Sequence, residues 1–101
     1  MWLFAMFDLP VLEPEERREY TRFRTALLNQ GFHMMQYSVY ARYCGSEEVA
    51  NRYRKDIKAL IPHDGEVRLM AVTDHQFAKM EIFRGKLTGK AEEPPEQLMF
   101  F

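Results

Sequence analysis

Cysteine is almost absent from this sequence, which contains only Cys44, and there is no long apolar run. A single cysteine excludes an internal disulfide and any metal site built from clustered cysteines. No segment has the length and apolarity of a membrane span. The N-terminus also lacks the basic start and the small-residue cleavage site of a signal peptide. These absences predict a cytoplasmic protein that does not bind membranes.

An excess of charge of one sign is lacking too, since the formal net charge is -1. Composition therefore gives no global argument for a nucleic-acid partner. The distribution of charge is more informative. The last eleven residues hold three of the 15 acidic residues and no Lys or Arg, which leaves 14 basic residues against 12 acidic ones in the rest of the chain. The body of the protein is mildly basic.

What the sequence does contain is apolar surface, with 47% hydrophobic and 14% aromatic residues in a chain of 101 residues. This proportion of apolar residues is typical of a packed domain. The length of the chain allows one such domain and leaves little room for a second. A chain of this length buries only roughly 60–68% of its unfolded surface. An additional interface would contribute noticeably to its stability, which makes a homodimer a reasonable expectation.

The first strand carries the residue of greatest chemical interest. Residues 2–9 alternate between two faces, and both faces are apolar until Asp8 interrupts one of them. A strand that is apolar on both sides usually lies in the middle of a sheet, and other parts of the protein cover both of its faces. Pro10 ends the strand because proline cannot donate to a sheet. Asp8 is thus expected near the end of a buried strand, where a carboxylate needs an ion pair, hydrogen bonds or a metal.

The rest of the chain alternates between helical and β periodicity. Helix start and stop signals predict a helix over 14–30 and a second helix that begins after Ser46, with Val49, Tyr53, Ile57 and Leu60 as its buried stripe. Period-two patterns predict β-structure over 32–43, as two short strands or one bent strand, and a strand over 66–73. Residues 76–83 are predicted as a turn followed by a short strand or a helical turn.

This order predicts an α+β fold, a ferredoxin-like βαββαβ domain over residues 1–84. Residues 85–97, with two glycines and a Glu-Glu-Pro-Pro-Glu run, are predicted as a linker. The apolar residues after it should add a strand to a sheet edge, on this subunit or a partner: Leu98, Met99, Phe100 and Phe101. Two helices cover one sheet face, so a second subunit is the simplest cover for the other.

Two candidate sites follow from these elements. Asp8 is a candidate catalytic carboxylate and magnesium ligand, since magnesium is held by carboxylates, waters and substrate phosphates, and a two-fold dimer supplies two copies. The alternative is that Asp8 accepts hydrogen bonds from the loop at 10–13. A second candidate is a nucleic-acid backbone surface made of arginines, for which the alternative is a solvated helix face: Arg17, Arg18, Arg22, Arg24 and Arg42.

Several short segments together resemble a known family. Their order and spacing are similar to those of the small CRISPR-associated adaptation protein, Cas-two: Phe-Asp-Leu-Pro at 7–10, Tyr-Thr-Arg-Phe-Arg at 20–24, residues 31–40, Val-Thr-Asp at 72–74 and Gln-Phe-Ala at 76–78. The resemblance implies a homodimer whose C-terminal strands complete the sheets and whose two Asp8 residues face each other. It also implies two roles, a metal-dependent endonuclease on RNA or DNA and a scaffold for the CRISPR integrase during spacer acquisition.

We take the adaptation scaffold as the main functional prediction, with duplex DNA and the CRISPR integrase as partners. The pattern is closest to the branch of the family that is associated with a single large effector nuclease. A stand-alone metal-dependent endoribonuclease is the second hypothesis, for which RNA is the ligand. A ferredoxin-like regulatory or sensor subunit is the third.

Overall fold

The first strand, β1 (Trp2–Asp8), lies in the middle of a four-stranded sheet with the order β2-β3-β1-β4. It pairs antiparallel with β3 (Val39–Tyr43) on one side and β4 (Glu66–Val72) on the other. The remaining strand, β2 (His33–Gln36), pairs with β3 at the edge. The structure is a computed structural model that describes residues 1–85. The predicted central position of β1 is confirmed.

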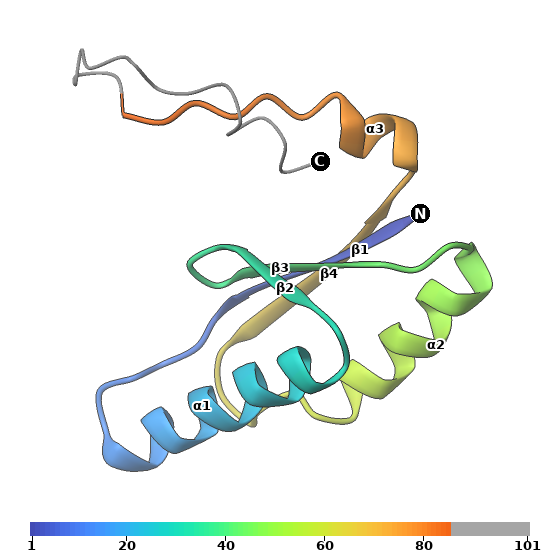
Figure 1. The fold of residues 1–101 in the computed structure, drawn as a ribbon. Coiled ribbons are helices and arrows are strands. Elements are labelled where there is room, and N and C mark those ends of the chain that lie inside the picture. The colour runs from blue at the N-terminus through green and yellow to red at the C-terminus, as the bar shows by residue number, and fades with distance from the viewer. Residues whose placement is uncertain (86–101) are drawn as a thin grey trace.

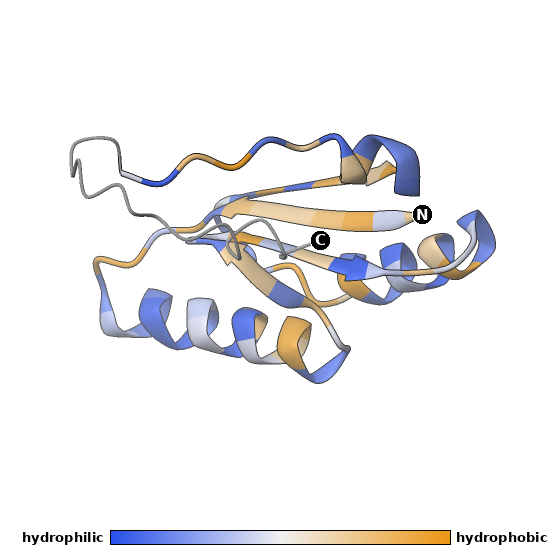
Figure 2. Cartoon of the chain, turned by 45° about the horizontal axis from the view of Figure 1, so that its top comes forward, coloured by the Kyte–Doolittle hydropathy of each residue, from blue (hydrophilic) through white to orange (hydrophobic). Residues whose placement is uncertain are grey.

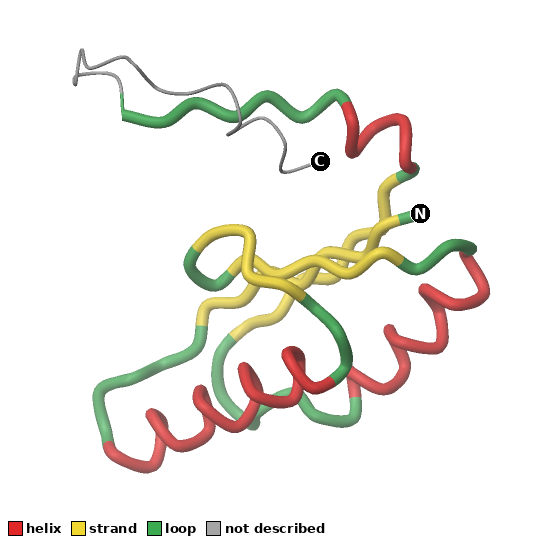
Figure 3. The backbone as a smooth tube through the Cα atoms, viewed as in Figure 1, coloured by secondary structure: helices red, strands yellow, loops and turns green. Residues whose placement is uncertain are grey.

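Two helices, α1 (Pro14–Asn29) and α2 (Glu47–Lys58), lie against one face of the sheet, and the short α3 (Asp74–Ala78) lies at the other face (Figures 1 and 3). The element order is β1-α1-β2-β3-α2-β4 before α3. This confirms the α+β, βαββαβ fold class. The β-structure predicted over 32–43 is two strands, and the segment after β4 forms a helical turn.

The main core lies between the sheet and the two long helices. Leu3 and Phe7 of β1 pack there with Phe23 and Leu27 of α1 and with Ile57 of α2, and all five are at most 7% exposed. Burying a large apolar side chain contributes about 1.5–3 kcal/mol. In Figure 2 the strands are mostly hydrophobic, while hydrophilic and hydrophobic residues alternate along the helices. The helices therefore follow the amphipathic pattern that the sequence predicts.

One predicted core residue lies elsewhere. Leu60 is 44% exposed, so its assignment to the buried stripe of the second helix is wrong. The helix ends at Lys58, two residues before Leu60. Leu60 therefore does not continue the helical period, and Ala50, which is fully buried, lies on the inner face instead.

The opposite face of the sheet has a smaller core of its own. Phe4, Ala41 and Phe77 are buried there, with Trp2 and Val72 packed against them. Phe77 comes from α3 and stacks on Trp2, with ring centroids 3.9 Å apart and planes 4° apart. This second core confirms that β1 is apolar on both faces.

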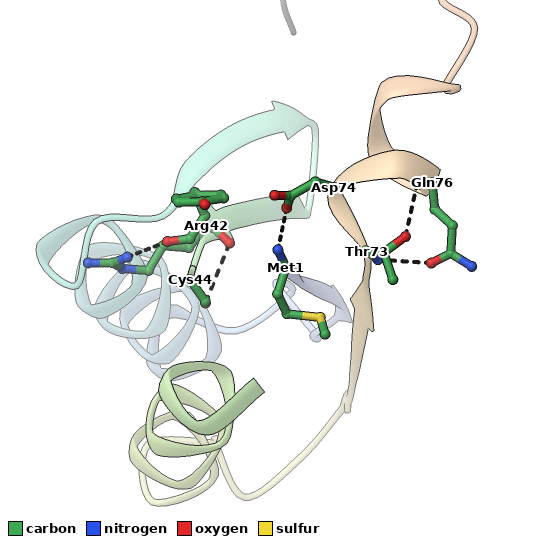
Figure 4. A network of polar contacts seen from close by, with 7 residues as sticks. Met1, Arg42, Cys44, Thr73, Asp74 and Gln76 are labelled. Carbon is green, nitrogen blue, oxygen red and sulfur yellow. Dashed lines mark hydrogen bonds and ion pairs between the residues drawn. The ribbon is translucent and has the colours of Figure 1, made fainter. Parts of the chain in front are cut away.

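α3 is fixed in place by polar contacts at its start (Figure 4). Thr73 and Gln76 form a capping box, in which the Gln76 N–H donates to the Thr73 hydroxyl and the Thr73 N–H donates to the Gln76 side chain. The amino group of Met1 forms an ion pair with Asp74. These contacts hold Phe77 over the Trp2 end of the second face.

The predicted linker and C-terminal strand lie outside the described residues, apart from Gly85. The proposed strand residues are therefore not placed: Leu98, Met99, Phe100 and Phe101. Within residues 1–85, none of the helices has the length and apolarity needed to cross a membrane.

Candidate functional site

Asp8 is the last residue of β1 and is exposed. Its side chain lies on the face that carries Phe4, because the alternate residue, Phe7, points into the main core. In the described part of the chain, the Asp8 carboxylate accepts no hydrogen bond. The N–H groups of Leu12 and Glu13 donate instead to Glu16, at 2.9 Å each. The structure therefore does not show the alternative role, in which Asp8 accepts hydrogen bonds from the loop that follows β1.

A glycine fixes the backbone at this end of β1. Gly65 has a φ of +100°, and a Cβ there would lie 2.9 Å from the Asp8 carbonyl oxygen and 2.7 Å from Leu9 Cδ2. The loop before β4 can therefore approach β1 only because residue 65 has no side chain.

We expect Gly65→Ala to lower the free energy of unfolding by about 1–3 kcal/mol or more, since a strained backbone and an overlap with the Asp8 carbonyl occur together. Urea denaturation would measure the loss. Gly45→Ala is a suitable comparison, because Gly45 also has positive φ, of 78°, but a Cβ there meets nothing closer than 4.0 Å. Equal losses in the two variants would contradict the close approach at Gly65.

Two charged residues that sequence reasoning missed lie beside Asp8. Glu66 is its Cα partner in the register between β1 and β4, and Arg68, two residues further on, lies on the same sheet face. Arg68 pairs with Glu66 at 3.1 Å, and both side chains are largely exposed. The alternation in 66–73 shows that these residues share a face, but only the register between the two strands places Glu66 opposite Asp8 and Arg68 opposite Met6.

The carboxylates of Asp8 and Glu66 in one subunit are too few to complete the ligand set of a divalent cation. Among residues 1–85, no three His, Cys, Asp or Glu side chains are grouped as metal ligands. Asp8 and its neighbour Glu66 supply carboxylate oxygens, which magnesium prefers. The remaining ligands must come from water, a substrate phosphate or a second subunit. An exposed carboxylate without a hydrogen-bond donor fits such a shared site.

The predicted arginines differ in the groups that they contact. Arg18 and Arg22 of α1, each 70% exposed, pair with Glu15 and Glu19 one turn earlier. Exposed pairs of this kind contribute only about 0–1 kcal/mol, so a phosphate could displace the glutamates. Arg17 donates to the Leu12 carbonyl at 2.8 Å.

Arg42 and Arg24 differ from these three. Arg42 donates to the Gln30 carbonyl at 2.8 Å, and its guanidinium lies 4.2 Å from the centroid of the Tyr53 ring. Arg42 thus caps a carbonyl at the C-terminal end of α1. Because its guanidinium is already engaged there, Arg42 is less available to a phosphate than the other arginines. Arg24 has no ion pair within residues 1–85 and is only half-buried.

α2 carries further cations that sequence reasoning did not select. Arg52, Lys55 and Lys58 are exposed, and within residues 1–85 none of them forms an ion pair. Their spacing of three residues places them along one side of the helix. That spacing was visible in the sequence, and it gives a second surface where a nucleic-acid backbone could lie.

The turn between β2 and β3 lies beside the Asp8 end of β1. The Phe7 N–H donates to the Ser38 carbonyl at 3.1 Å, and the Ser38 hydroxyl lies 3.3 Å from the Tyr20 hydroxyl. Tyr37, at the turn, is 74% exposed and stacks on Tyr20 with ring centroids 6.2 Å apart. A hydrogen bond with Tyr20, and then charge repulsion from it, raises the pKa of Tyr37.

Comparison with known proteins identifies the family. Residues 1–80 match the family described as CRISPR associated protein Cas2. The chain belongs to the Cas2 family. It is 46% identical, over the full length of both chains, to a CRISPR-associated endoribonuclease Cas2 of Parvibaculum lavamentivorans. The protein of the same name from Flavobacterium psychrophilum is 40% identical over all of this chain and 88% of its own.

A third relative, also a CRISPR-associated endoribonuclease Cas2, comes from Ligilactobacillus salivarius and is 43% identical over 85% of each chain. The family match confirms the resemblance seen in the sequence. It also covers every structural element from β1 to α3, and so includes Asp8, Glu66 and the turn that carries Tyr37.

Proposed function

We propose that this Cas2-family chain acts in the cytoplasm as a dimeric scaffold of CRISPR adaptation, which binds duplex DNA together with the CRISPR integrase during spacer acquisition. The observation that carries the proposal is the second face of the sheet. α3 covers its Trp2 end, but Tyr43 and Met70 on this face remain 49% and 48% exposed. A second copy packed on this face would bury these side chains and repeat Asp8 by symmetry.

The same dimer would carry a metal-dependent nuclease site. Asp8 from each subunit would hold a magnesium ion, with Glu66 on the neighbouring strand as a further carboxylate. A bound magnesium ion supplies a Lewis acid for the phosphoryl oxygen and an activated water. The exposed position of Asp8 leaves room for water and for a phosphodiester. The names of the relatives, which are endoribonucleases, support this part of the proposal.

A stand-alone endoribonuclease is the second candidate, and it uses the same Asp8 site on RNA. The regulatory alternative needs a pocket for a small molecule. A hollow of about 520 Å³ lies between α1 and the loop that follows α2, which is a suitable size for a small ligand. Its lining carries four carboxylates against one arginine, a poor match for an anionic nucleotide: Glu15, Glu16, Glu19, Asp64 and Arg22.

DNA binding through α1 predicts a change in salt dependence. We expect the double variant Arg18→Gln/Arg22→Gln to flatten the log-log salt slope of duplex binding by roughly 2–4 per dimer, because each lost phosphate contact removes about 0.9. The loss should be the same on unrelated DNA sequences, since backbone contacts carry no base readout. Fluorescence anisotropy over a range of salt concentrations measures the slope.

The matched control is Lys55→Gln/Lys58→Gln on α2, which removes the same charge from another exposed helix. If this control flattens the slope and the α1 variant does not, the DNA backbone lies on α2 and the assignment to α1 is wrong.

A further inference from the structure

Two carboxylates and one arginine lie together at the Asp8 end of the second sheet face. Asp8 and Glu66 are direct cross-strand partners, and Arg68 follows Glu66 by two residues on β4, so the three side chains share this face. Side chains directly opposite each other have Cβ atoms about 4.5–5.5 Å apart, and diagonal neighbours about 7–8 Å. The long side chain of Arg68 can therefore reach over both carboxylates.

Arg68 is the cation that the strands place on this face. The four strands contain two arginines and no lysine, and the other arginine, Arg42, is the cross-strand partner of Leu3, which packs in the main core. The partner of Arg68 on β1 is the uncharged Met6. At this end of the face, one positive charge thus lies beside two negative ones.

The ion pair between Arg68 and Glu66 can be exchanged without disturbing the core. Its nitrogen and oxygen atoms are 3.1 Å apart, and the two side chains are 71% and 63% exposed. Exposed pairs of this kind contribute little to stability, because water screens them and two long side chains must be ordered. A partner that binds either group more strongly will therefore displace the pair.

Metal and substrate are two such partners. A divalent cation held by Asp8 and Glu66 competes with Arg68 for the Glu66 carboxylate. The guanidinium that is displaced stays beside the carboxylates and can donate two parallel hydrogen bonds to a phosphate. A phosphodiester that approaches two carboxylates is repelled unless positive charge lies close by, so both the cation and Arg68 favour its binding.

We propose that Arg68 is a phosphate clamp, which Glu66 holds in the absence of metal and releases toward the substrate phosphodiester when Glu66 binds a divalent cation beside Asp8. This inference rests on the proposed nuclease site and adds a substrate-binding residue to it. Glu66 has two exchangeable partners, the guanidinium and the cation. Removal of Arg68 should therefore strengthen metal binding and weaken phosphate binding, whereas a purely structural role of the ion pair would weaken both.

The test measures binding of Mn²⁺ by electron paramagnetic resonance, and then binding of uridine 5′-monophosphate, which has no phosphodiester to cleave, by calorimetry at saturating Mn²⁺. Arg68→Gln should bind Mn²⁺ about two- to fivefold more tightly, because Glu66 has lost its competing partner. Its affinity for the nucleotide should fall about 10- to 150-fold, since a charged hydrogen bond to the phosphate is lost.

Arg68→Lys keeps the charge, so its affinity for Mn²⁺ should stay within about twofold of that of the parent protein. It should still bind the nucleotide more weakly than the parent, because an ammonium group lacks the fork that makes two parallel bonds. Lys79→Gln is the matched control, since Lys79 is an exposed cation at the end of α3, which covers the Trp2 end of the same face. Both affinities of this control should equal those of the parent within about twofold.

Two results would overturn the clamp alone. One is equal nucleotide binding by the parent and Arg68→Gln, and the other is a joint loss of Mn²⁺ and nucleotide binding in Arg68→Gln. Asp8→Asn that binds Mn²⁺ as tightly as the parent would instead refute the proposed metal site together with the clamp. Because these results differ in which variant changes, failure of the clamp is distinguishable from failure of the nuclease site.

Discussion

Asp8→Asn should abolish magnesium-dependent cleavage, by at least about 100-fold, while the protein still dimerises and binds duplex DNA. Asparagine keeps the size of the side chain but removes the charge that holds the metal. Metal stabilisation of a phosphoryl transition state is worth several kcal/mol, and 1.36 kcal/mol is a factor of ten in rate. Single-turnover cleavage of labelled RNA and DNA with magnesium, compared with EDTA, measures the effect.

Asp56→Asn on α2 is the matched control, since it removes one exposed carboxylate far from β1 in the sequence. Its cleavage rate should equal that of the unmodified protein. Cleavage that persists in the Asp8→Asn variant would show that Asp8 is not part of the active site.

The same variant separates the scaffold from the enzyme. If the main role is structural, Asp8→Asn should support integration by the partner integrase at the normal rate. It should also be slightly more stable without metal, because Asp8 and Glu66 are cross-strand partners and like charges directly opposite each other are destabilising. Loss of integration in a variant that folds, dimerises and binds DNA would mean that the carboxylate takes part in the integration reaction.

Much of the fold could be predicted because its signals are local. The two apolar faces of β1 predicted its central position, and the caps around α1 placed that helix within one residue of its observed end. Leu60 was misplaced because the helical period continues in the sequence after the backbone has left the helix. The signals that place helix ends are weaker than those that define helix faces.

The candidate site could be predicted only in part, because its neighbours come from distant segments. Asp8 stands out in the sequence as the only charge in an apolar strand. Glu66 does not, because its place opposite Asp8 depends on the register between two strands more than fifty residues apart. The position of the exposed Tyr37 ring also depends on tertiary structure, since Ser38 gives no sequence signal for a positive φ.

Met70→Glu should convert the proposed dimer to a monomer at micromolar concentration. Met70 is the cross-strand partner of Phe4 on the second face and is 48% exposed in one subunit. A two-fold interface built on this face would bury two copies of the new carboxylate without partners, and burying an unpaired charge is costly. We expect the dissociation constant to rise at least about 100-fold, which corresponds to roughly 2.7 kcal/mol. Sedimentation equilibrium measures it directly.

Leu28→Glu is the matched control, because Leu28 is 41% exposed but belongs to α1, on the other side of the sheet. This variant adds the same charge at similar exposure and should remain a dimer. Circular dichroism of both variants confirms that the subunit is folded, so that dissociation is not confused with unfolding. If Met70→Glu associates as tightly as the unmodified protein, or if Leu28→Glu alone dissociates, the second face of the sheet is not the interface and the two Asp8 residues are not paired across it.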